Sequence, residues 1–407
     1  MRTAKLKDIT LTITDGKHGD CKNHDGSGYY FISCKDVYDE TIHYENARQI
    51  TEDDFRDADR RTNLAAYDIL ITNSGTIGRM ALVKDIPETR KTTFQKSVAI
   101  VRADTSQVVP NYLYYLLKSK VHDFINSSNG SAQKNLLLST MRDFDISFVD
   151  SFETQHRIAT ILSRYDSLIE NYQKQIKLLE EAAQRLYKEW FVDLHFPGHE
   201  NTKIVDGVPE GWEKKTLGEL FSYVRGKSYS SNEISDEGCI MVNLKNIQAF
   251  GGYKRDAEKR FIGKYKPEQT LQKGDLVMGV TDMTQERRLV GHVALIPDFN
   301  EPATFSMDLI KINPYSVPII YLYCAMRYGG ISKQISPLAN GVNVLHLKPD
   351  AMMGTMMVVP RKDLIERFCP FVEEMTNKIL KNQSQIRLLT EARDRLLPKL
   401  MSGEIAV

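Results

Sequence analysis

A hydrophobic pattern with a strict 3.5-residue period constrains this chain more than any other feature of its sequence. Between residues 158 and 190, ten apolar or aromatic positions recur at alternating steps of four and three, and neither glycine nor proline occurs in 152–196. A period of 3.5 predicts one long helix with a coiled-coil seam, rather than the shorter amphipathic helix of a globular core. At about 1.5 Å per residue, roughly 40 residues would form a rod about 60 Å long.

The same helix is encoded twice, 210 residues apart. The segment NYQKQIKLLEEAAQRL (171–186) recurs as KNQSQIRLLTEARDRL (381–396), with nine of sixteen positions identical. The second copy keeps the seam, but places Asn382 where the first has Tyr172, and Arg393 where the first has Ala183. A lone polar residue in a seam commonly fixes register and partner at some cost in stability.

Neither helix can bury its seam alone. We expect the two helices to pack on each other as an antiparallel coiled coil; the alternative is that each pairs with a second chain. Pro370 is expected in the first turn of the second helix, which would begin irregularly around 367–371, and Pro398 is expected to end or kink it. The predicted seam comprises Tyr165, Ile169, Tyr172, Ile176, Leu179, Leu186, Ile379, Asn382, Ile386, Leu389 and Leu396.

The segments before the two helices also match, more weakly. Tyr67–Leu70 corresponds to Gly274–Val277, and Val109-Pro110, which opens an apolar helix, corresponds to Val317-Pro318. Asn129–Ser131 follows the first of these helices as Asn340–Val342 follows the second. Short β-rich runs separated by turn residues lie between these anchors, so each globular segment is predicted to be α+β with mostly antiparallel strands.

The predicted organisation is therefore a pseudo-twofold internal repeat in an α+β protein. We expect a globular domain at 1–150, a long helix at 151–197, a linker at 198–211, a second globular domain at 212–360 and a second long helix at 361–407. Two copies of one unit in tandem imply that the protein performs its task at two places.

Charge and cysteine content exclude several classes of protein. The 54 basic and 53 acidic residues give a net charge of +1, so the chain does not coat nucleic acid through bulk charge. No apolar run reaches the length of a membrane span. The five cysteines include no C-x-x-C pair, which disfavours disulfide frameworks and zinc clusters and favours a reduced, cytoplasmic setting.

Catalytic motifs are absent from the sequence. Gly226-Lys227-Ser228 ends like a P-loop, but Phe221 occupies the position of the first required glycine. There is no H-E-x-x-H or H-x-H pair for a metal and no G-x-S-x-G elbow for a nucleophile. The sequence predicts no catalytic or metal site in this chain, and a binding protein becomes the better interpretation.

Small-residue loops and basic segments are the candidate contact sites. The loop 73–79 offers backbone N–H groups, hydroxyls and an arginine for phosphate or base-edge contacts, and loops 15–18 and 225–227 are similar. A basic run with interleaved aromatics spans 245–273, and a longer loop spans 279–296. Plain β-turns and a solvated hairpin edge explain each segment equally simply. The candidates are Lys17, His18, Ser74, Thr76, Arg79, Lys227, Lys254, Arg255, Arg287 and Arg288.

Several segments together resemble one known family. They are RLYKEWFVDLHFPG (185–198) with the following GVPEGWEKKTLGEL (207–220), NSGTIGRMALV (73–83), NGSAQKNL (129–136) and the C-terminal RLLPKLMSGEI (395–405). With the order globule, long helix, globule, long helix, the chain resembles the specificity (S) subunit of type I restriction-modification systems over essentially its whole length. The loop 279–296 departs from the pattern, since it is longer and lacks Ser-Gly-Thr.

The resemblance implies a non-catalytic DNA-recognition subunit. Each globular domain would be a target-recognition domain reading one half of a bipartite, asymmetric site in double-stranded DNA. The helices would set the spacing and dock two modification (methyltransferase) subunits, which restriction (translocase-nuclease) subunits would join. S-adenosylmethionine, ATP and Mg²⁺ would belong to those partners, and no membrane would be involved. A homodimeric coiled-coil adaptor without a nucleic-acid role, and an enzyme fused to a helical spacer, are the alternatives.

Overall fold

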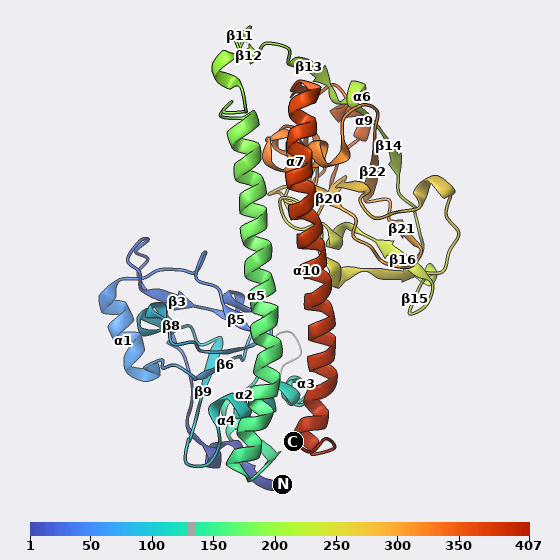
Figure 1. The fold of residues 1–407 in the computed structure, drawn as a ribbon. Coiled ribbons are helices and arrows are strands. Elements are labelled where there is room, and N and C mark those ends of the chain that lie inside the picture. The colour runs from blue at the N-terminus through green and yellow to red at the C-terminus, as the bar shows by residue number, and fades with distance from the viewer. Residues whose placement is uncertain (129–134) are drawn as a thin grey trace. The chain divides into compact units, whose positions relative to one another are not determined.

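The computed structural model describes residues 1–128 and 135–407, apart from the side chain of Asp256, and it divides into two compact units. Unit 1 comprises residues 1–170 and 387–407, and unit 2 comprises residues 171–386. Two long helices, α5 (Phe152–Phe191) and α10 (Lys362–Ser402), each contribute one part to each unit (Figure 1). The predicted repeat segment Asn129–Ser131, and most of NGSAQKNL, lie outside the described residues.

Unit 1 is built on a four-stranded antiparallel sheet in the order β2-β9-β6-β7, of which β9 and β6 are labelled in Figure 1. Because side chains alternate along a strand, this sheet has two apolar faces. Ile69, Ile71 and Val101 face a core that includes residues of α2, α5 and α10. Leu70 and Ile100 face a second core that includes Ile32 and Phe94. The strands are β2 (Thr10–Asp15), β9 (Val98–Ala103), β6 (Ile69–Thr72) and β7 (Met80–Leu82), and α2 is Pro110–Ser119.

Shorter elements complete unit 1. Two three-residue strands, β3 and β8, pair in parallel, and β1 pairs with β10 in antiparallel orientation. The bounds are β1 (Arg2–Lys5), β3 (Tyr30–Ile32), β4 (Val37–Tyr38), β5 (Thr41–Ile42), α1 (Glu52–Thr62), β8 (Thr92–Phe94), α3 (Val121–Asn126), α4 (Leu138–Arg142) and β10 (Asp145–Phe148).

Unit 2 repeats this topology. Its sheet has the order β14-β22-β18-β20, β16 pairs with β21 in parallel, and β13 pairs with β24 in antiparallel orientation. The α+β class and the internal repeat are therefore confirmed. The strands are β13 (Glu213–Thr216), β14 (Phe221–Arg225), β16 (Cys239–Val242), β18 (Leu276–Gly279), β20 (Val293–Leu295), β21 (Ala303–Phe305), β22 (Leu309–Pro314) and β24 (Met356–Val359), and α7 is Ile319–Tyr328.

The remaining elements of unit 2 are short. The hairpin of β11 and β12 lies in the predicted linker, and β15 and β17 extend the pair of β16 and β21 to four strands. The bounds are β11 (Ile204–Val205), β12 (Val208–Pro209), α6 (Leu217–Leu220), β15 (Ile234–Ser235), β17 (Lys259–Phe261), β19 (Thr281–Asp282), α8 (Ile331–Ile335), β23 (Leu345–His346) and α9 (Pro349–Met352).

Helices α5 and α10 pack antiparallel within each unit, as predicted. In unit 2, the Phe191 and Phe368 rings lie 4.8 Å apart, and Asn382 Nδ2 donates to Gln175 Oε1 at 3.1 Å. In unit 1, Arg393 Nη1 lies 2.6 Å from Asp166 Oδ1. All eleven predicted seam positions are buried or half-buried. The seam is therefore covered inside the chain, without a second copy.

The prediction that Pro370 lies in the first turn of the second helix was wrong. Helix α10 starts at Lys362 and ends at Ser402, so Pro370 lies beyond its first turn, and Pro398 does not end it. A proline leaves the carbonyl four residues earlier without its N–H donor. Pro370 and Pro398 are exposed, as are Glu366 and Asp394 at the i−4 positions, so water can reach those carbonyls. Packing holds the helix together on either side, through buried Phe368 and Val372, and through Leu397 and Leu400.

No helix within the described residues is long and apolar enough to cross a membrane.

Candidate nucleic-acid interface

In unit 1, four loops meet at one edge of the sheet. Lys17 N donates to Phe94 O at 2.8 Å, Gln95 N donates to Ile32 O at 2.8 Å, and Asn73 N donates to Ser97 O at 3.1 Å. These hydrogen bonds place the loops that follow β2, β3 and β6 beside the loop that connects β8 to β9. We call this the strand-end edge of unit 1, formed by residues 16–18, 33–36, 73–79 and 95–97.

Unit 2 has the same edge. Lys227 N donates to Phe305 O, Ser306 N donates to Val242 O, and Val280 N donates to Asp308 O, each at 2.8 Å. The strand-end edge of unit 2 is therefore formed by residues 226–228, 243–246, 280–290 and 306–308. Four loops converge in both units, so several side chains can contact one extended ligand together.

The predicted Gly-Lys loops occupy equivalent places on the two edges. A Cβ added at Gly16 would lie 2.1 Å from Phe94 O, and one at Gly226 would lie 2.0 Å from Ser306 O. The backbone therefore passes too close for any other residue, which explains why the glycine occurs in both copies. Packing accounts for this part of the repeat, and the lysine that follows remains the candidate contact.

The two equivalent lysines have different partners. Lys17 Nζ lies 3.0 Å from Asp57 Oδ2 and 3.7 Å from Asp54 Oδ1, both on α1. The hydrogen bond with Asp57 is the main reason why the pKa of Lys17 is raised. Lys227 forms no ion pair with the residues that the structure describes. His18 Nε2 lies 3.0 Å from Asp15 Oδ2, so both basic candidates of this unit-1 loop contact carboxylates.

The three predicted contact residues of loop 73–79 do not all lie in the same place. Ser74 forms a bridge with Asn135 at the strand-end edge, and Thr76 is exposed. Arg79 N donates to Thr72 Oγ1 at 2.9 Å, and the Arg79 side chain lines a hollow of about 580 Å³ together with Tyr38. Lys118 and His122 also line this hollow, but so do Asp39, Glu40 and Asp394, and Lys118 Nζ lies 2.6 Å from Glu40 Oε1.

In unit 2, the corresponding loop folds around the carboxylate of Asp282. Asp282 is fully buried; its Oδ1 accepts from Thr284 N at 2.8 Å and its Oδ2 accepts from Leu289 N at 2.6 Å. Burial alone would raise the pKa of Asp282, but these backbone hydrogen bonds outweigh it, and the pKa lies below the ordinary value. The loop thereby exposes Met283, at 77%, and Arg288, which pairs with Glu286. Arg287 is half-buried in a left-handed conformation with φ of 53°.

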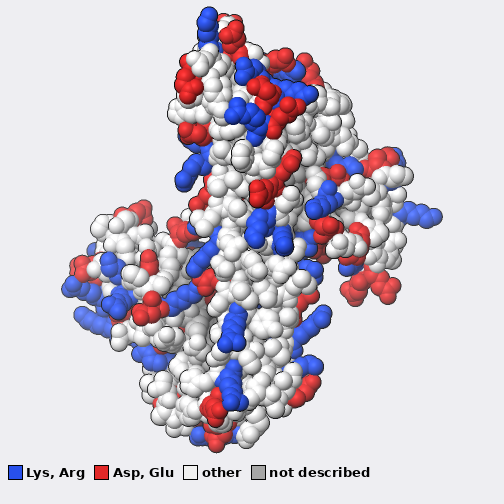
Figure 2. Space-filling model, viewed as in Figure 1, with Lys and Arg blue, Asp and Glu red and all other residues white. Residues whose placement is uncertain are grey.

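Most of the basic run 245–273 is engaged within unit 2. Lys259 Nζ donates to Tyr229 Oη at 2.8 Å, and Arg260 pairs with Glu301. Arg255 donates to the carbonyl of Asp298. Lys254 adjoins the strand-end edge, because its backbone N–H donates to Asn246 O at 2.9 Å. Figure 2 accordingly shows basic and acidic side chains interspersed over the visible surface, without a continuous basic field.

Two exposed lysines of the unit-1 edge, Lys35 and Lys96, were missed from the sequence. Lys245 of unit 2 is also exposed; it lies in the predicted basic run but was not singled out as a candidate. The missed signal was the spacing of the repeat, since Ser33-Cys34-Lys35-Asp36 and Asn243-Leu244-Lys245-Asn246 are also 210 residues apart.

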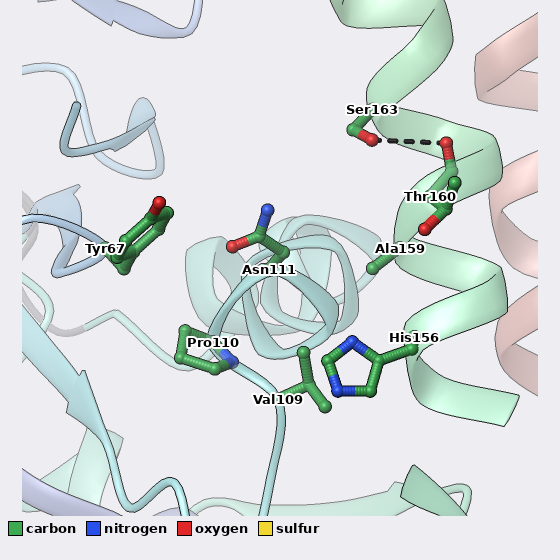
Figure 3. Close-up of a pocket in the computed structure, with 8 residues that line it drawn as sticks. All are labelled: Tyr67, Val109, Pro110, Asn111, His156, Ala159, Thr160 and Ser163. Carbon is green, nitrogen blue, oxygen red and sulfur yellow. Dashed lines mark hydrogen bonds between the residues drawn. The ribbon is translucent and has the colours of Figure 1, made fainter. Parts of the chain in front are cut away.

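A further hollow of about 350 Å³ lies where the start of α2 approaches α5 in unit 1 (Figure 3). Asn111 and His156 line it, and so does Tyr67, whose φ of 69° is left-handed where unit 2 has Gly274. Ser163 Oγ donates to Thr160 O at 3.1 Å within α5, so this hydroxyl is not paired with a base. The hollow is not arranged for nucleophilic catalysis. Within the described ranges, no three His, Cys, Asp or Glu side chains are grouped to hold a metal.

Comparisons with known proteins agree with this architecture. Residues 3–181 match the type I restriction modification DNA specificity domain. The chain is 29% identical over 399 residues to the type I restriction enzyme MjaIX specificity subunit of Methanocaldococcus jannaschii, covering 95% of this chain and 89% of that one. It is 21% identical over 375 residues to the HindI specificity subunit of Haemophilus influenzae, covering 75% and 80%.

The fold is also that of a solved relative. The crystal structure of the type I restriction-modification S subunit from M. genitalium superposes with a TM-score of 0.62 at 17% identity, covering 98% of this chain and 96% of that one. Residues 3–181 thus match the type I restriction modification DNA specificity domain, and the chain as a whole is similar in sequence to type I specificity subunits and in fold to one solved S subunit.

Proposed function

We propose that this chain recognises a bipartite, asymmetric site in double-stranded DNA for a type I restriction-modification complex, with each unit reading one half. The observation that carries the proposal is that one sheet topology and one strand-end edge occur twice, with different loops. Residues 73–79 form a small-residue turn in unit 1, whereas residues 280–290 fold around buried Asp282 in unit 2. Equal scaffolds with unequal loops suit two readers of different sequences.

The outward faces of the two long helices support docking of two copies of one partner. Leu178, Glu181, Ala182 and Arg185 are exposed on one face of α5, and the identical residues Leu388, Glu391, Ala392 and Arg395 are exposed on α10. Identity of seam residues is explained by burial, but identity of exposed residues is not. We infer that both faces bind the same protein surface, that of a modification subunit.

The chemistry of the complex would reside in the partners. The chain would act in the cytoplasm as a non-catalytic subunit, and the modification subunits would bind S-adenosylmethionine. The restriction subunits would use ATP and Mg²⁺. The near-neutral charge of this chain suits such an assembly, because the modification subunits would supply much of the phosphate contact.

Methylation mapping tests the function. In cells that carry this chain and its modification subunits, adenine methylation should occur at one bipartite motif and disappear when this chain is deleted. Unchanged methylation after deletion would contradict the proposal. The homodimeric adaptor makes a different prediction, since sedimentation of the purified chain at its monomer mass of 46.5 kDa would exclude it.

A further inference from the structure

Lys35 and Lys245 occupy equivalent turns of the two units. In unit 1, β3 leads into a 3-10 turn at Cys34–Asp36, and in unit 2, β16 leads into a 3-10 turn at Leu244–Asn246. The strand before each turn is paired in parallel with a strand that leads into another loop of the same edge. These pairs are β3 with β8 in unit 1 and β16 with β21 in unit 2. The lysine is the second residue of both turns.

Buried polar side chains hold both turns rigidly. Ser33 N donates to Asp36 Oδ2 at 2.8 Å, and Asn243 N donates to Asn246 Oδ1 at 2.9 Å. These four residues are buried, whereas Lys35 and Lys245 between them are exposed. A rigid support with an exposed cation is a suitable arrangement for placing a charge on a ligand.

Both turns adjoin the loops that differ between the units. A Cβ added at Gly75 would lie 2.8 Å from Cys34 Sγ, and one at Gly279 would lie 3.2 Å from Leu244 Cδ1. The residue that precedes each lysine therefore packs against the start of the loop that we propose reads the DNA.

Neither lysine is neutralised by the protein. Lys35 and Lys245 form no ion pair with any residue that the structure describes, in contrast to Lys17, which is held by Asp57 and Asp54. Each amino group is therefore available to an external anion.

We propose that Lys35 and Lys245 bind DNA phosphates, one in each half-site, and fix the position of each unit on the duplex. The inference rests on the proposed function. A residue that is the same in both units cannot distinguish two different half-sites, so it must contact what the half-sites share. The sugar-phosphate backbone is that shared part, and lysine binds phosphate as a point charge.

Salt-dependent DNA binding tests this assignment. The full chain with its modification subunits is compared with Lys35→Ala, Lys245→Ala and the double variant, on a duplex with the methylated motif and on an unrelated duplex of equal length. Each substitution should weaken binding to both duplexes by the same factor. It should also reduce the slope of log K against log salt by about 0.9. Lys203→Ala, an exposed lysine of the linker, is the matched control and should leave the slope unchanged.

Conservative variants and the methylated motif complete the test. Lys35→Arg and Lys245→Arg should restore the slope, and the methylated motif should stay the same in every variant. Wild-type slopes in the alanine variants would overturn the inference, as would weakening confined to the motif duplex together with an altered motif. If the wild-type complex bound neither duplex, the proposed function would fail first, and this inference with it.

Discussion

Arg393 shows how one buried charge ties a long helix to a globular segment. The side chain is 5% exposed, and its Nη1 lies 2.8 Å from Glu40 Oε2 and 2.6 Å from Asp166 Oδ1. Burial alone would raise the pKa of Glu40, but the charges of Lys118 and Arg393 outweigh it and lower that pKa. In unit 2 the two charges are exchanged. The arginine, Arg327, lies in the globular segment on α7, and it pairs with Glu180 of the long helix α5 at 2.9 Å.

Replacing Arg393 should destabilise unit 1. In Arg393→Ala, Glu40 and Asp166 lose their shared cation, which should lower the free energy of unfolding by about 2–3 kcal/mol, discounted because both carboxylates are partly exposed. Urea denaturation measures this loss. Arg387→Ala removes an exposed i,i+4 pair with Glu391 from the same helix and should cost under about 0.5 kcal/mol. Equal effects of the two variants would contradict the network.

Asp282 should make the stability of unit 2 depend on pH. Its folded pKa lies below the ordinary value of 3.8, so its contribution is complete above that pH and is lost as pH falls through the folded pKa. Asp282→Asn should cost about 1–3 kcal/mol at pH 7, because an amide cannot accept all the same N–H bonds. Urea denaturation at pH 7 and at successive pH values below 4 measures the free energy of unfolding of both proteins. The difference between Asp282→Asn and wild type should shrink as the pH falls.

The control for Asp282 is another loop aspartate. Asp298 is exposed and accepts one backbone hydrogen bond, from Asn300 N at 3.0 Å. Asp298→Asn should therefore change stability by less than about 0.5 kcal/mol. A constant difference between wild type and Asp282→Asn over the acid range would refute the role of the ionised carboxylate.

At the scale of single residues, the sequence predicted which side chains lie inside the helix pair better than it predicted which side chains they contact. The seam period placed Asn382 and Arg393 inside the helix pair, where both are buried. It could not predict Glu40 as a partner of Arg393, because 353 residues separate them and no local pattern connects them. Lys35 was missed for a related reason. One exposed lysine in a turn is not distinctive by itself, and it becomes a candidate only when it is aligned with the equivalent lysine of the second unit.

Helix α10 is the element in which local rules and packing disagree. Two prolines interrupt its hydrogen bonding, yet it runs unbroken from Lys362 to Ser402. Its seam side is fixed by buried residues, and its other side exposes Leu388, at 49%, where α5 exposes Leu178 at 64%. An element of this kind can serve two partners, one inside the chain and one outside.

Charge on the outward leucines should block docking without unfolding the helices. Leu178→Glu or Leu388→Glu should each remove one modification subunit from the complex, and the double variant should remove both, because a carboxylate cannot enter an apolar contact without cost. Mass measurement of the purified complexes gives the count. Leu168→Glu is the control, because Leu168 is exposed on α5 but has Lys378 at the repeat position. Two bound subunits in the double variant would refute the docking faces.

The sequence predicted long elements and missed short ones. A 3.5-residue period over ten positions predicts a long coiled-coil helix, and the antiparallel pairing inside the chain was the preferred one of two possible packings. The parallel pairing of β3 with β8, and of β16 with β21, had no such signal, because a three- or four-residue strand is too short to show alternation. The fold of loop 280–290 likewise depends on the burial of Asp282, which composition does not reveal.

At the scale of the whole molecule, the long helices belong to both units. The division falls after Glu170 in α5 and after Ile386 in α10. Any change of length at these two points alters the helical connection between the units and leaves the strand-end edges untouched. Spacing and reading should therefore be separable.

Lengthening both helices should change the gap in the DNA site and nothing else. One heptad inserted after Glu170 and another after Ile386 would preserve the seam and add about 10 Å, or roughly three base pairs. Methylation mapping should find both half-sites unchanged with a longer unread gap. The same heptad in α5 alone should disrupt the pairing and abolish methylation. An altered half-site would contradict separate roles for helices and loops.

The discontinuity of unit 1 also has a consequence for biosynthesis. Its core includes Leu397, Leu400 and Met401, which leave the ribosome after all 216 residues of unit 2 (171–386). At 5–20 residues per second, the nascent chain would wait roughly 10–40 s with Ile158 and Leu162 lacking their cover. Unit 1 can therefore be completed only after unit 2 has been synthesised. The first globular unit to be translated is thus the last to be completed.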